Sequence, residues 1–532
     1  MHPSFRDFDP AVSVTNLRAH RHGVRFGVTL ASGARLRAEV TFYQGGFVRV
    51  RFGDRRRVPA RDDVDFTALE PDEVSVSRWE NHAVIAGERL CLRLRLDVFH
   101  LEVGRDSDGW ETLWASGFDD LDPAGRPRVL TLGVTSDGRM AASFALDPTE
   151  HVYGLGEQFT RLDRYGQTLE GTSPFFASSK GYGVLFNSAR PLRHEIASPR
   201  LSLLSYVVTS PVPALEYVVL DGPDLRGVIS RLWRVTTREA SPPEWALGLI
   251  VPTRDPGDVT ERWREHGVRA EVTDETNLVC WGSRAVGTLG AMAAALRGAL
   301  GCGLSGQPWW GNTVNNSTSS LTPELFVRWS QFGLLSSHVQ YVNPARAPWT
   351  FGPRAEAIFA RYARLRSELR PYLHHLAWEA REHGWPLMRA MTFEFPDDPT
   401  CLTLETQYML GPDLLVAPVL TPAAHVTVYL PDGEWIEALS NRTFTGPRWL
   451  RLRELPLESM PLYMRSDAAI PLALDPDCPE GPYTFDLFVR LGFQRTFELP
   501  GGRVTLQVER AGREVFVDAR AGAGRHTLRL RG

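Results

Sequence analysis

The sequence contains a single lysine, Lys180, and all its other basic residues are arginines, so it has no lysine-rich tract. Acidic and basic residues nearly balance, with 63 Asp and Glu against 59 Lys and Arg, for a net charge of −4. A long basic tract or a strongly positive domain is typical of proteins that bind nucleic acid. Because this chain has neither, we expect no nucleic-acid partner.

Cysteines are also few. The chain has five, an odd number, which are scattered along its length, and none forms a CxxC pair. This spacing predicts neither a disulfide framework nor a zinc site. For the chain as a whole we expect no metal ion and no other cofactor. Proteins without disulfides are typical of a reducing compartment, so the cysteine pattern predicts a cytoplasmic location.

Long apolar segments are absent as well. No apolar run reaches the roughly 18 residues that a membrane-spanning helix needs, so we expect no membrane partner. The first residues, MHPSFRDFDPAVSV, carry charges and prolines. A signal peptide has an apolar core at that place, so this start predicts no secretion signal.

The chain does have enough length and apolar content for several domains. It has 532 residues, of which 43% are hydrophobic, and about 150 residues per domain gives three to four domains. Residues 1–240 contain short alternating runs such as VRFGVTL (24–30) and FVRVRF (47–52), separated by turn residues. Repeated short strands of this kind are typical of a β-sandwich.

The pattern changes after the Pro-rich segment ASPPEW (240–245). In residues 241–395, short apolar runs alternate with helical patterns, which predicts a parallel sheet or (β/α) barrel. Residues 396–470 and 471–532 return to the strand pattern and predict a proximal C-terminal β-sandwich and a distal β-domain. The predicted fold class is therefore multidomain α/β plus β.

Several stretches occur in the order found in one enzyme family. They are HVYGLGEQFTRLDRYGQTLE (151–170), SPFFASSKGYGVLFNSA (173–189), WALGL (245–249), LRGALGCGLSG (296–306), RWSQFGLLSSH (328–338), APWTFG (347–352), GWPLMRAMTFEFPDD (384–398) and QYMLGPDLLVAPVL (407–420). The series resembles glycoside hydrolase family 31, the α-glucosidases and α-xylosidases, and their α-xylosidase branch in particular. The resemblance implies an N-terminal β-sandwich, a (β/α)8 barrel and two C-terminal β-domains. It also implies a metal-free, retaining glycosidase that acts on α-linked oligosaccharides or glycosides.

Retaining hydrolysis needs two carboxyl groups about 5–5.5 Å apart. The resemblance places the family's nucleophile at Asp274, at the end of GVRAEVTD (267–274), although the family's neighbouring Lys and Phe-Gly are absent. It places the family's acid/base aspartate at Arg284. Arginine stays protonated and cannot transfer a proton, so the catalytic acid is predicted to be lost.

Two sugar-binding positions of the family are substituted as well. The resemblance places its hydroxyl-binding aspartate at Thr313 and its sugar-binding arginine at Gln340, whereas His338 is retained. A lone histidine at such a position is more often a hydrogen-bonded core or rim residue than a catalyst. Both interpretations of His338 stay open on the sequence.

Four further residues are candidates for substrate contact. Trp281 and Trp310 have rings that suit the apolar face of a sugar, although a double tryptophan such as Trp309–Trp310 is as often part of a core. The resemblance places Glu157 and Asp163 in a loop near the barrel mouth. There they either contact sugar or stabilise the loop by hydrogen bonds.

The predicted barrel region is short. A (β/α)8 barrel takes about 250 residues, whereas residues 245–395 number about 150. Between WALGL and LRGAL about 46 residues remain, which leaves room for about two strand–helix units where the family has about five. We therefore predict a truncated barrel that is open, remodelled or completed by another chain.

Three functions follow from these observations. The first is a non-catalytic member that binds α-linked glucosides or xylosides, or serves as a partner subunit in a homo- or hetero-oligomer, because missing strands expose apolar surface. The second is a residual retaining α-glycosidase with Asp274 as nucleophile. Its neighbour Glu275 cannot simply be the second carboxylate, because adjacent strand residues face opposite sides. The third is a lyase or transglycosylase. The substitutions favour the first.

Overall fold

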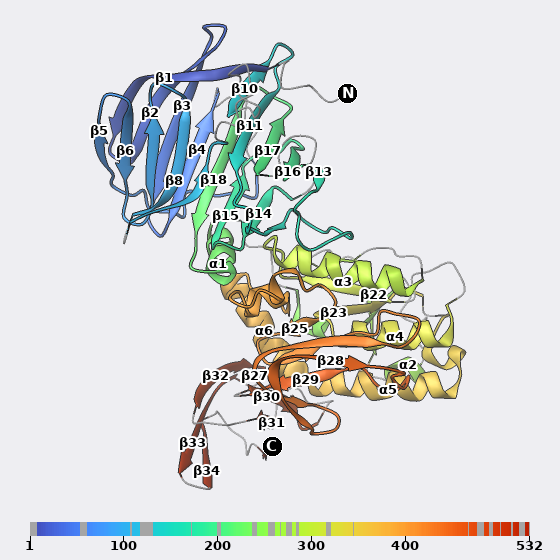
Figure 1. The fold of residues 1–532 in the computed structure, drawn as a ribbon. Coiled ribbons are helices and arrows are strands. Elements are labelled where there is room, and N and C mark those ends of the chain that lie inside the picture. Colours follow the sequence, from blue (N-terminus) through green and yellow to red (C-terminus); the bar gives the residue numbers. More distant parts are fainter. Residues whose placement is uncertain are drawn as a thin grey trace. The chain divides into compact units, whose positions relative to one another are not determined.

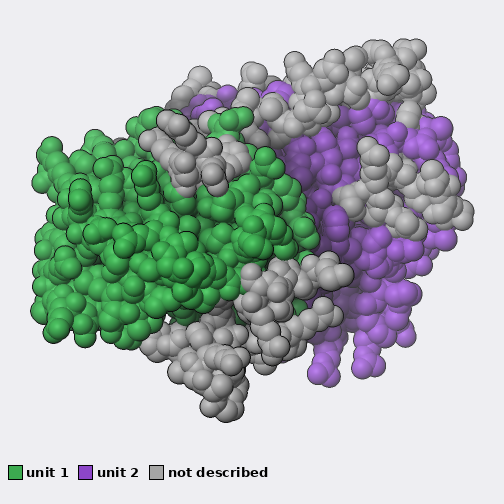
Figure 2. All heavy atoms as spheres, turned by 90° about the horizontal axis from the view of Figure 1, so that it is seen from above, with its two compact units in different colours: residues 1–156, 163–238, 304–306 green, residues 157–162, 239–303, 307–532 purple. Residues whose placement is uncertain are grey.

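The computed structural model describes most of the chain (Figure 1). The described residues are 8–53, 61–106, 109–117, 131–171, 173–198, 204–236, 242–253, 261–265, 268–272, 279–282, 287–314, 321–343, 345–466, 468–475, 483–488, 493–500, 502–511, 514–520 and 527–530. The chain forms two compact units, coloured green and purple in Figure 2. The first unit comprises residues 1–156, 163–238 and 304–306, and the second comprises residues 157–162, 239–303 and 307–532.

Two antiparallel sheets form the first unit. The larger has 13 strands in the order β12-β14-β15-β18-β4-β3-β2-β1-β10-β11-β17-β16-β13, and the smaller has the order β5-β6-β7-β8-β9. The strands are β1 (Phe8–His20), β2 (Gly23–Leu30), β3 (Arg35–Tyr43), β4 (Phe47–Phe52), β5 (Ser75–Arg78), β6 (His82–Ala86), β7 (Cys91–Arg95), β8 (His100–Asp106), β9 (Trp110–Ala115), β10 (Leu132–Thr135), β11 (Met140–Ala145), β12 (Val152–Gly154), β13 (Thr168–Glu170), β14 (Phe175–Ser178), β15 (Tyr182–Phe186), β16 (Arg193–Ile196), β17 (Ser205–Ser210) and β18 (Leu215–Asp221). One helix, α1 (Leu225–Val235), follows them.

Alternating side chains build the core of this unit. In β2, Val24, Phe26 and Val28 are buried whereas Arg25 is exposed, as the pleat of a half-buried strand requires. At the centre, Trp114 stacks on Phe144 with ring centroids 4.0 Å apart. The inward face is therefore apolar, and the outward face of β2 to β4 carries charged residues instead.

A parallel sheet lies in the second unit. Its strands are β19 (Leu249–Thr253), β20 (Val268–Val272), β21 (Cys280–Trp281), β22 (Trp310–Val314) and β23 (His338–Tyr341), in the order β20-β19-β23-β22-β21. In a (β/α)8 barrel, consecutive strands are neighbours and the last pairs with the first. Here the last strand, β23, also pairs with the first, β19. Among the described residues, the two outer strands β20 and β21 are not paired with each other.

This strand order shows where the barrel is interrupted. Strands β19 and β20 are neighbours, and β21, β22 and β23 are neighbours in sequence order, so the break lies between β20 and β21. Only residues 273–279 separate these two strands in the chain. A strand–helix–strand crossover needs at least about 10–12 residues, so this connection is too short for another strand–helix unit. The described sheet has five strands instead of eight.

The second unit contains several helices. They are α2 (Glu261–Glu265), α3 (Leu289–Gly303), α4 (Pro323–Leu334), α5 (Pro353–Glu368), α6 (Arg370–His383) and α7 (Met391–Glu394), with 3-10 helices η3 (Glu244–Leu247), η6 (Pro348–Phe351) and η7 (Cys401–Thr403). Of these, α2, α4 and α5 pack on one face of the parallel sheet. From β23, the Tyr341 ring contacts Trp263 of α2, Phe326 of α4 and Phe359 of α5. Tyr341 therefore faces the helices, and so does Val339, two residues before it in the same strand.

Three antiparallel or mixed sheets complete the second unit. The six-stranded sheet has the order β24-β25-β26-β29-β27-β28, and two three-stranded sheets have the orders β30-β31-β35 and β32-β33-β34. Their strands are β24 (Met388–Arg389), β25 (Tyr408–Leu410), β26 (Leu414–Val416), β27 (Val426–Glu437), β28 (Thr443–Leu452), β29 (Leu462–Arg465), β30 (Ala468–Ala473), β31 (Tyr483–Phe488), β32 (Phe493–Leu499), β33 (Gly502–Ala511), β34 (Glu514–Arg520) and β35 (Thr527–Leu530). The predicted fold class, multidomain α/β plus β, is confirmed. None of the described helices has the length and apolarity needed to cross a membrane.

Candidate functional site

Side chains that the sequence singles out meet on the inner face of the parallel sheet, which we define as the face opposite the helices. Gly311 of β22 is the direct partner of His338 in β23 and of Trp281 in β21. Two residues further along, Thr313 is the direct partner of Gln340. Because directly paired residues of parallel strands share a face, these residues form two adjacent rows.

The second row contains the two substituted sugar positions. The Gln340 side chain donates a hydrogen bond from Nε2 to Thr313 Oγ1 over 3.0 Å. Both residues are buried, with 8% of Thr313 and 7% of Gln340 exposed. The predicted equivalents of the family's aspartate and arginine are thus in contact, and they form a neutral pair.

The two candidate tryptophans lie on opposite faces of the sheet. The Trp281 ring lies against Gly311 on the inner face, where a Cβ on Gly311 would overlap it. Trp281 is half-buried. Trp310 is buried on the helix face, against Gly282, and donates from its indole nitrogen to Glu157 Oε1 over 3.2 Å. Only Trp281 therefore shares a face with Thr313 and Gln340.

The two loop carboxylates belong to different units. Glu157 lies in the second unit, where it accepts the hydrogen bond from Trp310. Asp163 lies in the first unit and is buried. Its carboxylate is 2.8 Å from His151 Nδ1 and accepts a hydrogen bond from the backbone nitrogen of Tyr165 over 3.0 Å. These contacts of Asp163 stabilise the loop.

His338 is fully buried on the inner face. Burial lowers the pKa of His338 to about 3, and the positive charge of Arg366 acts in the same direction. The Trp309 ring packs edge-on against it, with centroids 6.2 Å apart. The imidazole is therefore neutral near pH 7 and cannot supply a proton there as a general acid.

The predicted nucleophile and acid positions, Asp274 and Arg284, lie outside the described residues, as does Glu275. The structure therefore places the two rows that contain Trp281, Thr313 and Gln340, but not the two positions predicted to carry the chemistry. Among the described side chains, no group of three or more His, Cys, Asp or Glu residues is arranged to hold a metal ion.

Buried histidines predict that the protein loses stability in mild acid. Burial lowers the pKa of His194 and of His338 to about 3 and that of His375 to about 4, all from an ordinary value of 6.5. Below pH 6.5 the unfolded chain binds protons that the folded one does not. The free energy of unfolding should then fall by about 1.4 kcal/mol per pH unit for each histidine. Above pH 6.5 this contribution is fully present.

Thermal unfolding measured from pH 8 to pH 4 checks this expectation. The midpoint should fall steadily below pH 6.5, and a His338→Gln variant should lose part of that slope. His425, which is exposed in the same unit, provides the matched control. The unfolding midpoint of the His425→Gln variant should fall with pH as steeply as that of the wild type. If the midpoint of the His338→Gln variant falls just as steeply, the buried imidazole does not cause the acid sensitivity.

Comparison with known proteins points to one family. Residues 37–193 match the glycosyl hydrolase 31 N-terminal galactose mutarotase-like domain, residues 273–376 match the family 31 TIM-barrel domain, and residues 384–470 match the family 31 C-terminal domain. The barrel match begins directly after β20 in the chain, at the place where the sheet is interrupted.

Relatives and solved structures agree with these matches. An α-xylosidase of Emericella nidulans is 35% identical over 213 residues, which are 38% of this chain and 27% of that protein. An α-xylosidase of Saccharolobus solfataricus is 30% identical over 203 residues, which are 36% of this chain and 28% of that protein. The chain thus spans little more than a quarter of the length of these curated relatives.

Similarity of fold extends over almost the whole chain. A Flavobacterium johnsoniae family 31 dextranase complexed with isomaltotriose aligns with a TM-score of 0.82 at 18% identity, over 98% of this chain and 92% of that one. A family 31 α-xylosidase from a soil metagenome, complexed with xylose, aligns with a TM-score of 0.70 at 17% identity. It covers 85% of this chain and 98% of that chain. At these identities the alignments support the fold and nothing finer.

Proposed function

The chain belongs to glycoside hydrolase family 31, and from this we propose that it is a non-catalytic member that binds an α-linked glucoside or xyloside. The observation that carries the proposal is the hydrogen bond between Gln340 and Thr313. By the resemblance, these positions hold a charged arginine and aspartate in active members. A neutral, mutually satisfied pair offers the sugar no charged hydrogen bond, which is the stronger kind.

The interrupted sheet supports the same proposal. Catalytic groups of a barrel enzyme come from the C-terminal ends of several strands. The described sheet has five such ends, and the break falls between β20 and β21. The predicted acid position after β21 is occupied by Arg284, whose fixed positive charge would repel an oxocarbenium-like sugar.

Trp281 is the residue we propose for sugar contact. Its half-buried ring lies against Gly311, on the same face as Thr313 and Gln340. An aromatic ring with an accessible face provides an apolar platform for the C–H face of a pyranose. Weak sugar binding therefore requires none of the charged groups that hydrolysis needs.

The test compares turnover with binding. We expect no hydrolysis of p-nitrophenyl α-glucoside or α-xyloside between pH 4 and pH 8, but saturable binding of maltose or isoprimeverose by calorimetry. Trp281→Ala should abolish that binding, whereas Trp79→Ala, which removes an exposed tryptophan from the first unit, should not. Turnover that disappears in an Asp274→Asn variant would instead establish the residual glycosidase.

We also propose that the chain serves as a partner subunit in an oligomer. The cysteine pattern favours a cytoplasmic location for it. The outer strands β20 and β21 have no partner strand on one side among the described residues. Unpaired strand edges are ready templates for a strand from another chain. Light scattering on the purified protein checks this, since a monomer at all concentrations would argue against a homo-oligomer.

A further inference from the structure

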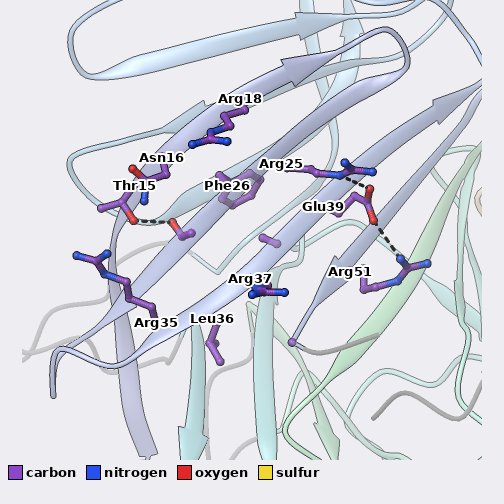
Figure 3. Close-up of a pocket in the computed structure, with 13 residues that line it drawn as sticks. Thr15, Asn16, Arg18, Arg25, Phe26, Arg35, Leu36, Arg37, Glu39 and Arg51 are labelled. Atoms are coloured by element: carbon purple, nitrogen blue, oxygen red, sulfur yellow. Dashed lines mark hydrogen bonds and ion pairs between the residues drawn. The ribbon is translucent and has the colours of Figure 1, made fainter. Parts of the chain in front are cut away.

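A groove of about 790 Å³ lies on the outward face of the first unit, across strands β1 to β4 (Figure 3). Its charged lining consists of five arginines and one glutamate: Arg18, Arg25, Arg35, Arg37, Arg51 and Glu39. All of these residues belong to the first unit and lie outside the sugar-binding rows. A ligand held in this groove would bind independently of the proposed sugar site.

Two glycines that line the groove flank Arg37 in the sheet. Gly27 of β2 is the direct strand partner of Arg37 in β3. On the other side, the backbone nitrogen of Gly53 donates to the Arg37 carbonyl oxygen over 2.9 Å. Gly53 has a φ of 91°, a conformation that suits glycine. A Cβ on Gly27 would meet Thr15 Oγ1 at 2.8 Å, and a Cβ on Gly53 would meet the Pro213 carbonyl oxygen at 2.5 Å, so neither neighbour of Arg37 has room for a side chain.

The arginines differ in how their charges are compensated. Figure 3 shows Glu39 between two of them: it accepts hydrogen bonds from Arg25 Nε over 2.7 Å and from Arg51 Nη1 over 3.1 Å. A second carboxylate, Glu216 of β18, accepts from Arg51 Nε over 2.5 Å. Arg25 and Arg51 are therefore paired with carboxylates that the fold supplies, although Glu216 also accepts a hydrogen bond from Arg49 Nε over 2.8 Å.

Three arginines remain uncompensated. Arg18, Arg35 and Arg37 are exposed, and their guanidinium groups form no ion pair or hydrogen bond with any side chain that the structure describes. Like charges gathered on one concave surface raise the local concentration of anions. A guanidinium group binds a phosphate or carboxylate through two parallel N–H donors.

The size and the lining of the groove narrow the class of ligand. Its volume falls within the range of about 300–1,000 Å³ that small-molecule sites occupy. Its one aromatic residue, Phe26, is 4% exposed and cannot stack on a base or a sugar ring. Single-stranded nucleic acid is typically bound by a positive groove together with exposed aromatic rings, so the groove does not fit that ligand.

We propose that this groove binds a small polyanion, of the size of a sugar phosphate or an oligouronate, through phosphate or carboxylate groups held by Arg18, Arg35 and Arg37. The test titrates the full chain with inorganic pyrophosphate, glucose 6-phosphate and digalacturonate, with glucose as the neutral control. Low salt, about 0.05 M NaCl, keeps electrostatic screening weak. Saturable binding of the charged probes and none of glucose is expected. The preferred probe distinguishes phosphate from carboxylate as the recognised group.

Matched variants locate the binding. Arg37→Ser should lower the affinity for the tightest-binding probe at least about tenfold, as expected for the loss of charge-assisted hydrogen bonds. Arg78→Ser removes the same charge from β5, an exposed position outside the groove, and should leave affinity unchanged. Arg35→Ser serves as a second groove variant if Arg37→Ser fails to fold. Glu39→Gln should tighten binding several-fold, because it removes the only negative charge of the lining.

Four results would overturn the proposal. They are the absence of saturable binding by all three charged probes, equal weakening by Arg37→Ser and Arg78→Ser, weaker binding by Glu39→Gln, and a length-dependent preference for single-stranded DNA over the small anions. The second result would mean that the net charge of the surface, rather than the groove, attracts the anion.

Discussion

Replacing Arg366 by methionine should destabilise the second unit by several kcal/mol. Arg366, in α5, is fully buried and donates to four backbone carbonyl oxygens: those of Gly248 over 3.2 Å, Leu334 over 3.0 Å, Ser336 over 2.7 Å and Ser337 over 2.8 Å. Each buried carbonyl left without a donor costs about 1–3 kcal/mol. Methionine fills a similar volume but donates nothing.

The position of these carbonyls explains why the effect should be large. Gly248 directly precedes β19 and Ser337 directly precedes β23, the first and last strands of the interrupted sheet. Arg366 thus joins the starts of the two strands whose pairing corresponds to closure in a complete barrel. Burial lowers the pKa of Arg366 to about 9, so the side chain still carries its charge at pH 7.

Hydrogen exchange measures this effect in the second unit alone. Amides of β19 and β23 should lose most of their protection in Arg366→Met, whereas Arg366→Lys, with fewer donors, should be intermediate. Arg361→Met makes the same change at an exposed position of the same helix and should be close to wild type. Equal protection in Arg361→Met and Arg366→Met would show that the four hydrogen bonds do not stabilise the sheet.

Local sequence patterns predicted the elements of the fold well. The runs VRFGVTL and FVRVRF correspond to β2 and β4, and Pro371 lies in the first turn of α6, directly after the boundary between α5 and α6. Both signals are local, because side chains alternate along a strand and proline disrupts a helix. Counting residues also predicted that barrel strands are missing.

Which strands are missing could not be predicted from the count. The answer depends on β23 pairing with β19, and that contact joins residues about 90 positions apart in the chain. No local pattern encodes such a pairing. The contact between Thr313 and Gln340 is of the same kind, because it depends on the register of β22 against β23.

The arrangement of the tryptophans, by contrast, could be predicted from the sequence. Trp310 and Thr313 are three residues apart in one strand, so they must face opposite sides of the sheet. This alternation alone places Trp310 on the face of the sheet opposite Thr313. The arginine groove was missed for a different reason: Arg35 and Arg37 alternate visibly in β3, but the glycines beside Arg37 become neighbours only through strand register.

Restoring the charged pair at positions 313 and 340 should produce strong coupling between the two substitutions. Thr313→Asp alone or Gln340→Arg alone places an unpaired charge in a nearly buried site, at a cost of about 3–5 kcal/mol. In the double variant the two charges face each other across paired strands, where the present side chains lie 3.0 Å apart. A coupling energy of about 1–3 kcal/mol is therefore expected.

Chemical denaturation of the wild type, both single variants and the double variant measures this coupling. The penalty of Thr313→Asp should shrink as the pH is lowered, because burial favours the protonated carboxyl and raises its pKa. A Thr313→Asn/Gln340→Arg variant keeps the shape of the pair without the negative charge and should remain as unstable as Gln340→Arg. Additive effects in the Asp/Arg cycle would mean that the two side chains do not face each other.

The same double variant tests why this chain would have lost its activity. If the neutral pair limits only sugar binding, the Asp/Arg variant should bind maltose or isoprimeverose more tightly than wild type, by about tenfold for one charge-assisted hydrogen bond. It should still not hydrolyse p-nitrophenyl glycosides, because Arg284 cannot transfer a proton. Hydrolysis by the double variant would mean that another group serves as the acid, and that substrate binding alone limits the wild-type protein.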